Sequence, residues 1–121
     1  MYKTIKYVQE SRYGILTLNR PEKLNSFNQE MHDELRDVFS SKLLESNIRC
    51  LLLTGSGKAF CAGQDLDDRL FSPDSPPDLK ESLEENYNPL ITDIISLEFP
   101  VVCAVNGIAA GAGVGIALAC A

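Results

Sequence analysis

Two short glycine-containing segments carry the residues best suited to chemistry in this sequence. The first is A-F-C-A-G-Q-D-L at residues 59–66, and the second is A-V-N-G-I-A-A-G-A-G at residues 104–113. Each follows an apolar, strand-like run and leads into a predicted helix, whose first main-chain N–H groups have no acceptor within the helix. Two such groups aimed at one point can hold the negative charge that develops on a carbonyl oxygen. Either segment alone is equally typical of an ordinary strand-to-helix turn.

The sequence contains incomplete versions of two nucleotide-binding motifs. The G-S-G-K run at residues 55–58 has the end of a phosphate-binding P-loop, but Leu52 stands where that loop needs glycine. Ala59 also replaces the Ser or Thr that must follow the lysine. The glycines at residues 111–115 fall short of a dinucleotide fingerprint, because Ile116 occupies the third glycine position. These glycines therefore indicate close backbone packing or approach to a ligand.

Composition limits the function classes further. A chain of 121 residues with 45% hydrophobic and 23% charged residues is one globular domain at most. Its net charge of −6 disfavours nucleic acid as a partner. No run of about 18 apolar residues is present, so no membrane association is expected, and residues 1–6 are too polar for a secretory signal. The four cysteines lack C-x-x-C spacing, and Cys50 and Cys103 are expected to be buried, which fits a reducing cytoplasm.

Alternating strand-like and helical patterns predict an α/β fold. Strands are expected at residues 2–8, 14–18, 50–54 and 101–105. The first two should form a hairpin around a turn at residues 9–13. The last two are short, continuous apolar runs, which are typical of strands covered on both faces.

Four helical segments are predicted, beginning near residues 28, 63, 78 and 112. In the first, apolar residues recur every three or four positions to about residue 45, and Ser26 with Gln29 has capping-box spacing. The second should run to about residue 70. Pro89 should kink the third helix or split it into two, and the apolar face of this helix includes Ile95. The fourth should still be helical at the chain end, Ala121.

Two groups of polar residues have a weaker claim to a role. The single histidine, His32, is expected on the solvated surface of the first helix. Asp65, Asp67 and Asp68 could form an acid/base pair or bind a metal. Carboxylates in the first turn of a helix are, however, stabilised by the helix dipole, and this structural interpretation is favoured. No metal site is therefore predicted.

The order and spacing of the two glycine segments resemble those of the enoyl-CoA hydratase/isomerase (crotonase) superfamily. Within it, R-P-E-K-L-N-S-F-N at residues 20–28 and G-Q-D-L-D-D-R at residues 63–69 look most like the phenylacetate-pathway branch of ring-epoxide isomerases. The resemblance implies that residues 1–121 form the N-terminal part of a single ββα-superhelix domain, whose C-terminal remainder is absent. It also implies an acyl-CoA thioester as substrate, with coenzyme A as part of that substrate and no further cofactor. Family members are usually homo-oligomers, namely trimers or dimers of trimers.

The resemblance also implies a site. Its oxyanion donors would be the main-chain N–H groups of Gln64 and Ala112, so the side chains there can vary. The residues implied to line the substrate and CoA channel are Lys23, Leu24, Asn25, Ala62, Gly63, Asp65, Leu66 and Gly111. The first three would lie near the adenine and pantetheine. Because the chain is acidic overall, the anionic CoA would have to be met locally, by Arg20, Lys23 or Lys58.

One departure from the family pattern bears on the reaction. Family hydratases carry a glutamate at the position of Gly115, and their second glutamate would lie beyond residue 121. The phenylacetate-type isomerases also lack the first glutamate and use a later aspartate. The sequence therefore favours an acyl-CoA isomerase of aromatic degradation. The alternatives are an enoyl-CoA hydratase of fatty-acid breakdown, and a catalytically incomplete CoA-binding or assembly fragment.

Overall fold

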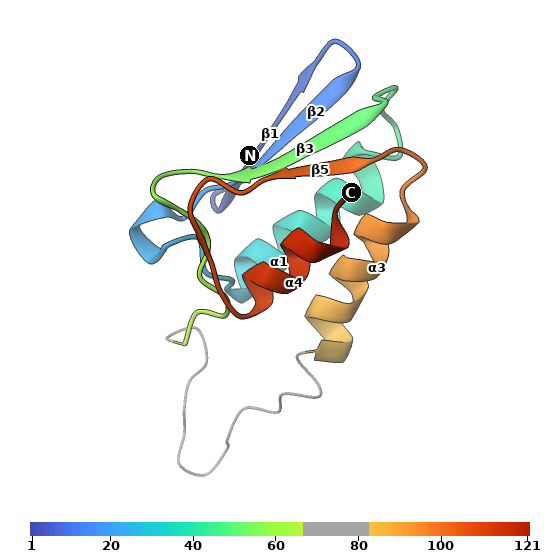
Figure 1. Cartoon of the computed structure of the whole chain (residues 1–121). Helices are drawn as coiled ribbons and strands as arrows, with labels where there is room; N and C mark the ends of the chain where they lie inside the picture. The colour runs from blue at the N-terminus through green and yellow to red at the C-terminus, as the bar shows by residue number, and fades with distance from the viewer. Residues whose placement is uncertain (67–82) are drawn as a thin grey trace.

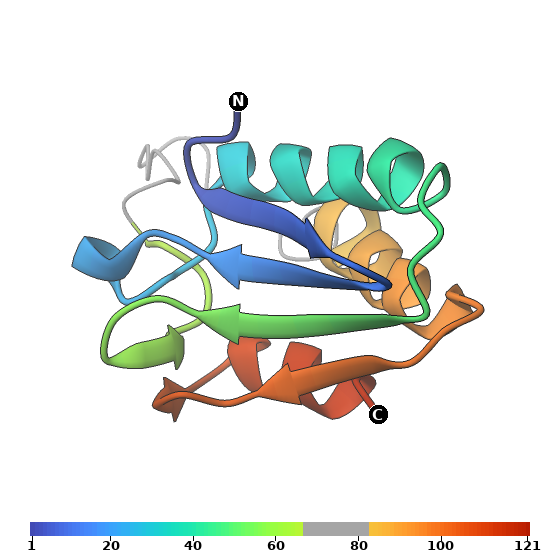
Figure 2. The same cartoon turned by 90° about the horizontal axis from the view of Figure 1, so that it is seen from above.

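A computed structural model describes residues 1–66 and 83–121 and shows an α/β arrangement built on a four-stranded sheet. Its strands are β1 (Ile5–Glu10), β2 (Tyr13–Leu18), β3 (Cys50–Gly55) and β5 (Val101–Ala104). They lie in the order β1-β2-β3-β5, which can be followed in Figure 2. The β1–β2 pair is antiparallel and the other two pairs are parallel. The predicted α/β class and hairpin are therefore confirmed.

A second, two-stranded parallel sheet lies beyond the carboxyl ends of β3 and β5. It consists of β4 (Ala59–Cys61) and β6 (Ile108–Ala109). These two strands belong to the two glycine-containing segments, so the small sheet brings together residues that are almost fifty positions apart in the sequence.

The helices are α1 (Gln29–Asp37), α3 (Asn88–Ser96) and α4 (Ala112–Ala119), with shorter helical turns η1 (Pro21–Lys23), η2 (Val38–Lys42) and η3 (Leu83–Tyr87). α1, α3 and α4 all lie on the same face of the four-stranded sheet (Figure 1). β2 and β3 turn alternate apolar side chains toward that face: Leu16, Leu18, Leu51 and Leu53 are buried. The core therefore lies between one sheet face and the three helices.

The strands at 50–54 and 101–105 are found, but the expectation that both faces are covered is wrong. In β3, Cys50 and Leu52 are only half-buried, and in β5 the side chain of Val102 is 43% exposed. The described helices pack on one face only, so the opposite face keeps its apolar residues without a covering layer. Cys103, expected to be buried, is half-buried too, although it lies on the same face of β5 as Val101 and packs against the core.

The first helix begins at a different cap from the predicted one. Asn28 is the N-cap residue, and its side-chain oxygen accepts a hydrogen bond from the Met31 N–H at 2.8 Å. The capping role assigned to Ser26 is therefore wrong. The helix keeps its α geometry only to Asp37 and continues as a wider π-helical turn, η2.

The later helices follow the sequence more closely. Pro89 occupies the first turn of α3, directly after η3, and Tyr87 keeps helical backbone angles, so the helix is not split there but changes from π to α geometry. Ile95 does not belong to the buried face, where Leu90 and Ile94 lie instead. α4 begins at Ala112 as expected, but it ends at Ala119 because Cys120 has an extended backbone. No helix is present over residues 63–66, and the remainder of the predicted 63–70 helix lies outside the described residues.

Candidate functional site

The loop that follows β2 takes an unusual backbone path. Leu24 and Asn25 both have left-handed backbone angles, with φ of 54° and 57°, which costs most residues about 1–2 kcal/mol. The fully buried Asn25 side chain holds this path. Its Oδ1 accepts from the Arg20 N–H (2.7 Å), and its Nδ2 donates to the carbonyl oxygens of Ser56 (2.9 Å) and Ala59 (3.0 Å). One side chain thus joins the loop to the turn between β3 and β4.

A nearly buried ion pair forms the second link of this loop. Arg20 donates through Nη2 to Asp65 Oδ2 (2.9 Å) and through Nη1 to the Ser26 carbonyl (2.6 Å). Both terminal nitrogens of Arg20 are therefore engaged within the protein. The other two residues expected to meet the anionic CoA, Lys23 and Lys58, are exposed. Asp65 acts as the partner of Arg20, whereas Asp67 and Asp68 lie outside the described residues.

The chain around Gln64 is fixed by a short parallel bridge to Phe27. The Phe27 N–H donates to the Gly63 carbonyl (2.7 Å), and the Asp65 N–H donates to the Phe27 carbonyl (2.8 Å). In a parallel pairing, the residue between these two bonds turns its own N–H and C=O away from the partner strand. The Gln64 N–H is accordingly directed away from Phe27. One step earlier, the Ala62 N–H donates to the Leu24 carbonyl (3.0 Å).

The second glycine segment lies directly against the first. The Ala110 N–H donates to the Cys61 carbonyl at 3.0 Å, which extends the β4–β6 pairing. Gly63 has a φ of 104°, and a Cβ placed there would lie 3.2 Å from the Ala110 carbonyl oxygen and 3.7 Å from the Ala112 nitrogen. A Cβ at Gly113 would lie 2.3 Å from the Cys61 carbonyl oxygen. Glycine is thus required at both positions, and it allows the two backbones to touch.

α4 starts within this contact. Ala112 is its first residue, so its N–H has no acceptor within the helix, whereas the Gly113 and Val114 N–H groups donate to Ala110 and Gly111. The structure therefore brings most of the sequence-predicted site residues into one region: Leu24, Asn25, Ala62, Gly63, Gln64, Asp65, Gly111 and Ala112. Lys23 and Leu66 are at its margin, and the Leu66 side chain is 68% exposed.

An aromatic cluster beside this region was not expected from the sequence. His32 is buried, not solvated: its ring stacks on Phe27 with the centroids 4.7 Å apart. Tyr87 meets both rings edge-on, at 5.6 Å from Phe27 and 4.5 Å from His32. The Tyr87 hydroxyl donates a hydrogen bond to Gln64 Oε1. The helical pattern gave Tyr87 an apolar-face position, but no local signal connects it with Gln64.

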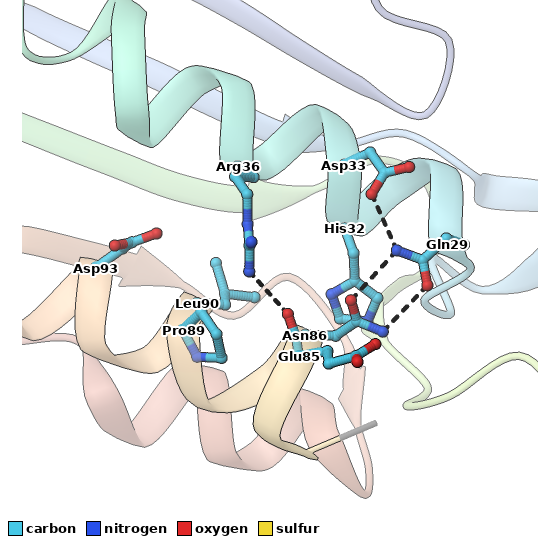
Figure 3. Close-up of a pocket in the computed structure, with 9 residues that line it drawn as sticks. All are labelled: Gln29, His32, Asp33, Arg36, Glu85, Asn86, Pro89, Leu90 and Asp93. Carbon is cyan, nitrogen blue, oxygen red and sulfur yellow. Dashed lines mark hydrogen bonds between the residues drawn. The ribbon is translucent and has the colours of Figure 1, made fainter. Parts of the chain in front are cut away.

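A polar cavity of about 340 Å³ lies between α1 and the η3–α3 segment (Figure 3). Two contacts join its walls: the amides of Gln29 and Asn86 bond reciprocally, and Arg36 donates to the Glu85 carbonyl at 2.7 Å. Burial raises the pKa of Asp93 in this cavity, and the nearby Arg36 opposes that rise. The full lining is Gln29, His32, Asp33, Arg36, Glu85, Asn86, Pro89, Leu90 and Asp93. None of the predicted site residues lines it.

Comparison with known proteins identifies the family. The family model described as enoyl-CoA hydratase/isomerase matches residues 10–121. The chain belongs to this family. A 1,2-epoxyphenylacetyl-CoA isomerase of Escherichia coli (strain K12) is 58% identical over 104 residues, covering 85% of this chain and 40% of that protein.

Solved structures of the family share the fold. A Mycobacterium smegmatis enoyl-CoA hydratase matches 98% of this chain with a TM-score of 0.86 and 30% identity. An enoyl-CoA hydratase/isomerase of Xanthobacter autotrophicus Py2 matches 99% with a TM-score of 0.87 and 26% identity. The chain covers 46% and 45% of these structures and corresponds to the N-terminal portion of the crotonase fold. It thus spans less than half the length of its family relatives.

The described residues give little support for a reactive cysteine or a metal site. Burial raises the pKa of Cys61 to about 11, against a smaller lowering effect of the Gly63 backbone, so its thiol is not an activated nucleophile. Within residues 1–66 and 83–121, no group of three or more His, Cys, Asp or Glu side chains is placed to share a metal ion. No helix in the same two stretches has the length and apolar character needed to cross a membrane.

Proposed function

We propose that the full-length gene product is an acyl-CoA isomerase that polarises the thioester carbonyl with the main-chain N–H groups of Gln64 and Ala112. The observation that carries this proposal is the contact of the two glycine segments. Gly63 lies against Ala112, and both donors flank this contact. A thioester whose carbonyl accepts two such bonds can pass through an enolate-like transition state at its α-carbon. Removal of one donor of this kind costs roughly 2.7–4 kcal/mol of transition-state stabilisation.

The remaining residues of the region suit the binding of coenzyme A. Lys23 is exposed at the end of η1 and can reach a phosphate group from the surface. Leu24 and Asn25 shape the adjoining backbone, and Ala62 and Gly63 present small surfaces that leave room for a pantetheine chain. Asp65, Leu66 and Gly111 are proposed to complete this channel. Asp65 would contribute to the channel only indirectly, because its carboxylate pairs with Arg20.

Isomerisation of an aromatic-ring epoxide is preferred over hydration for two reasons. The Escherichia coli relative, at 58% identity, is a 1,2-epoxyphenylacetyl-CoA isomerase. In addition, Gly115 supplies no carboxylate where family hydratases carry a glutamate, although a Cβ there would meet no heavy atom of the described residues outside α4 within 4 Å. Hydration of an enoyl-CoA is the second candidate, because the matched Mycobacterium smegmatis structure is an enoyl-CoA hydratase.

The test of the reaction is a direct comparison of substrates. The full-length gene product is assayed with 1,2-epoxyphenylacetyl-CoA for isomerisation and with crotonyl-CoA for hydration. We expect kcat/KM for isomerisation to exceed that for hydration by at least about a hundredfold. A dominant hydratase activity would overturn the isomerase assignment.

The test of the oxyanion donors uses Ala112→Pro. Proline fits the first position of a helix, where its missing N–H is not needed for helical bonding. We therefore expect a small change in the melting temperature and a fall in kcat of about 10²- to 10³-fold. Ala112→Ser keeps the N–H and is the matched control, with kcat expected within about tenfold of the parent. If both variants had the same activity, the Ala112 N–H would not be a donor.

A further inference from the structure

Gln64 is held by two groups that approach it from different elements. Its backbone is fixed by Phe27, whose N–H bonds to the Gly63 carbonyl at 2.7 Å. Its side-chain oxygen is held by the hydroxyl of Tyr87, the last residue of η3. The two holding residues also touch each other, since the Phe27 and Tyr87 rings lie edge to face at 5.6 Å.

The backbone anchor alone leaves one degree of freedom. The Gly63 carbonyl and the Gln64 N–H belong to the same peptide plane, so the bond from Phe27 sets the side on which the Gln64 N–H lies. The next peptide plane is held likewise, by the bond from the Asp65 N–H to the Phe27 carbonyl, but the Gly63–Gln64 plane itself is held at one point and can still rock about that bond. It is also preceded by Gly63, which has no side chain to restrain it. A second anchor on the Gln64 side chain removes this motion.

We propose that Tyr87 is a positioning residue for catalysis, which acts through the Gln64 side chain to fix the direction of the Gln64 N–H toward the substrate carbonyl. The inference rests on the proposed function and deepens it, because an oxyanion donor contributes most when it is oriented before the substrate arrives. It also gives the Gln64 side chain a role, although the donor itself is main chain. The His32 ring, which contacts both Phe27 and Tyr87, supports the arrangement from the α1 side.

The test uses Tyr87→Phe in the full-length gene product. This variant keeps the ring contacts and removes only the hydroxyl. We expect kcat to fall about tenfold while KM changes less than about twofold, because orientation in the transition state is lost and binding is not. Tyr13→Phe, at an exposed tyrosine of β2, is the matched control and should leave both constants unchanged.

A spectroscopic readout separates positioning from a general structural role. A ¹³C-labelled thioester substrate analogue is bound, and its carbonyl stretching frequency is measured by difference infrared spectroscopy. In the parent protein the frequency should fall relative to free ligand, because the carbonyl is polarised. In Tyr87→Phe it should move back toward the free value. An unchanged frequency in that variant, or a loss confined to KM and the melting temperature, would overturn the positioning role.

A double-mutant cycle tests whether the effect passes through Gln64. Gln64→Leu removes the acceptor of the Tyr87 hydroxyl, so the double variant should be no slower than the slower single variant. Additive losses would show that Tyr87 acts by another route and would overturn the inference. The proposed function fails separately, if the parent protein itself leaves the carbonyl frequency of the bound thioester unshifted.

Discussion

At the scale of single residues, the Asn25 side chain joins the loop after β2 to the β3–β4 turn. It is fully buried, it has a left-handed backbone, and its amide bonds to three main-chain groups of two different segments. The small amide is suited to this position, because asparagine accepts left-handed angles more readily than most residues. Asn25 is therefore one of the side chains that fix the geometry of the loop and of the β3–β4 turn.

This dependence can be tested with Asn25→Ala and Asn25→Gly. Alanine leaves buried backbone groups unpaired and adds backbone strain, so it should lower the free energy of unfolding by about 2–4 kcal/mol. Glycine loses the same bonds but accepts the backbone angles, so it should be about 1 kcal/mol less damaging than alanine. Urea denaturation measures both, with the exposed Asn47→Ala as control. If glycine were the worse substitution, the backbone argument would be wrong.

Cys61 gives the fold a pH dependence at alkaline pH. Burial raises the pKa of its thiol from 9.0 to about 11 in the folded protein. Between these values the unfolded chain releases the proton and the folded chain keeps it, so the stabilisation is complete below pH 9 and is lost as the pH rises through 11. The change corresponds to about 3 kcal/mol. Between pH 8 and pH 11, the free energy of unfolding measured with urea should fall more for the parent protein than for Cys61→Ala. Equal losses in the two proteins would refute the role of Cys61.

At the scale of elements, α1 depends on its N-cap. Asn28 accepts the Met31 N–H, whereas Ser26 serves the loop through its carbonyl, which accepts from Arg20. Asn28→Ala should therefore lower the free energy of unfolding by about 1 kcal/mol, and Asn28→Ser should recover most of it. Ser26→Ala is the discriminating control and should cost less than about 0.5 kcal/mol. A larger cost for Ser26→Ala, measured by urea denaturation, would favour the cap predicted from the sequence.

Sequence reasoning succeeded for elements whose signals are local. The hairpin and the start of α4 at Ala112 follow from turn residues and glycine placement over a few positions. It failed where distant segments decide the outcome. His32 looks like a surface residue in its own helix, but Phe27 and Tyr87, which come from other segments, pack against its ring and help to bury it.

In the candidate site, too, the sequence indicated the features with local signals and missed the contacts between distant segments. The two glycine segments were found from their residues alone, and the structure places them in contact. The ion pair between Arg20 and Asp65 joins residues 45 positions apart, so no local pattern could have indicated it. For the same reason, the sequence did not indicate that the Tyr87 hydroxyl bonds to the Gln64 side chain. The roles of the Gln64 and Ala112 N–H groups stay predictions until the variants are measured.

At the scale of the whole molecule, the chain exposes apolar side chains along β5, β6 and α4. Val102, Ile108 and Leu118 are 43%, 64% and 79% exposed. Exposed apolar surface of this kind favours association, because burial against a second molecule removes it from water. Of these, Val102 lies on the open sheet face, which the described helices leave uncovered, whereas Ile108 belongs to the small sheet and Leu118 to α4 on the other face.

The 121-residue chain on its own is therefore expected to associate or to be poorly soluble. Light scattering at tens of micromolar should give a mass well above 13.3 kDa. The combined variant Val102→Thr and Leu118→Ser should shift the distribution toward the monomer, whereas the exposed polar change Lys6→Gln should not. A sharp species of 13.3 kDa with cooperative thermal unfolding would show that the apolar surface does not drive association.

The open space around Gly115 has an evolutionary consequence. Glycine is a poor helix former, and most other residues would favour α4 by up to about 1 kcal/mol at that position. Outside α4 itself, no heavy atom of the described residues lies within 4 Å of the Cβ that a new side chain would bring, and a single nucleotide change from a glycine to a glutamate codon would add a carboxylate. Such a mutation would alter the chemistry available next to the glycine segments without a folding defect for selection to remove. Family members with and without a carboxylate at this position can therefore evolve from one another by a change at this one codon.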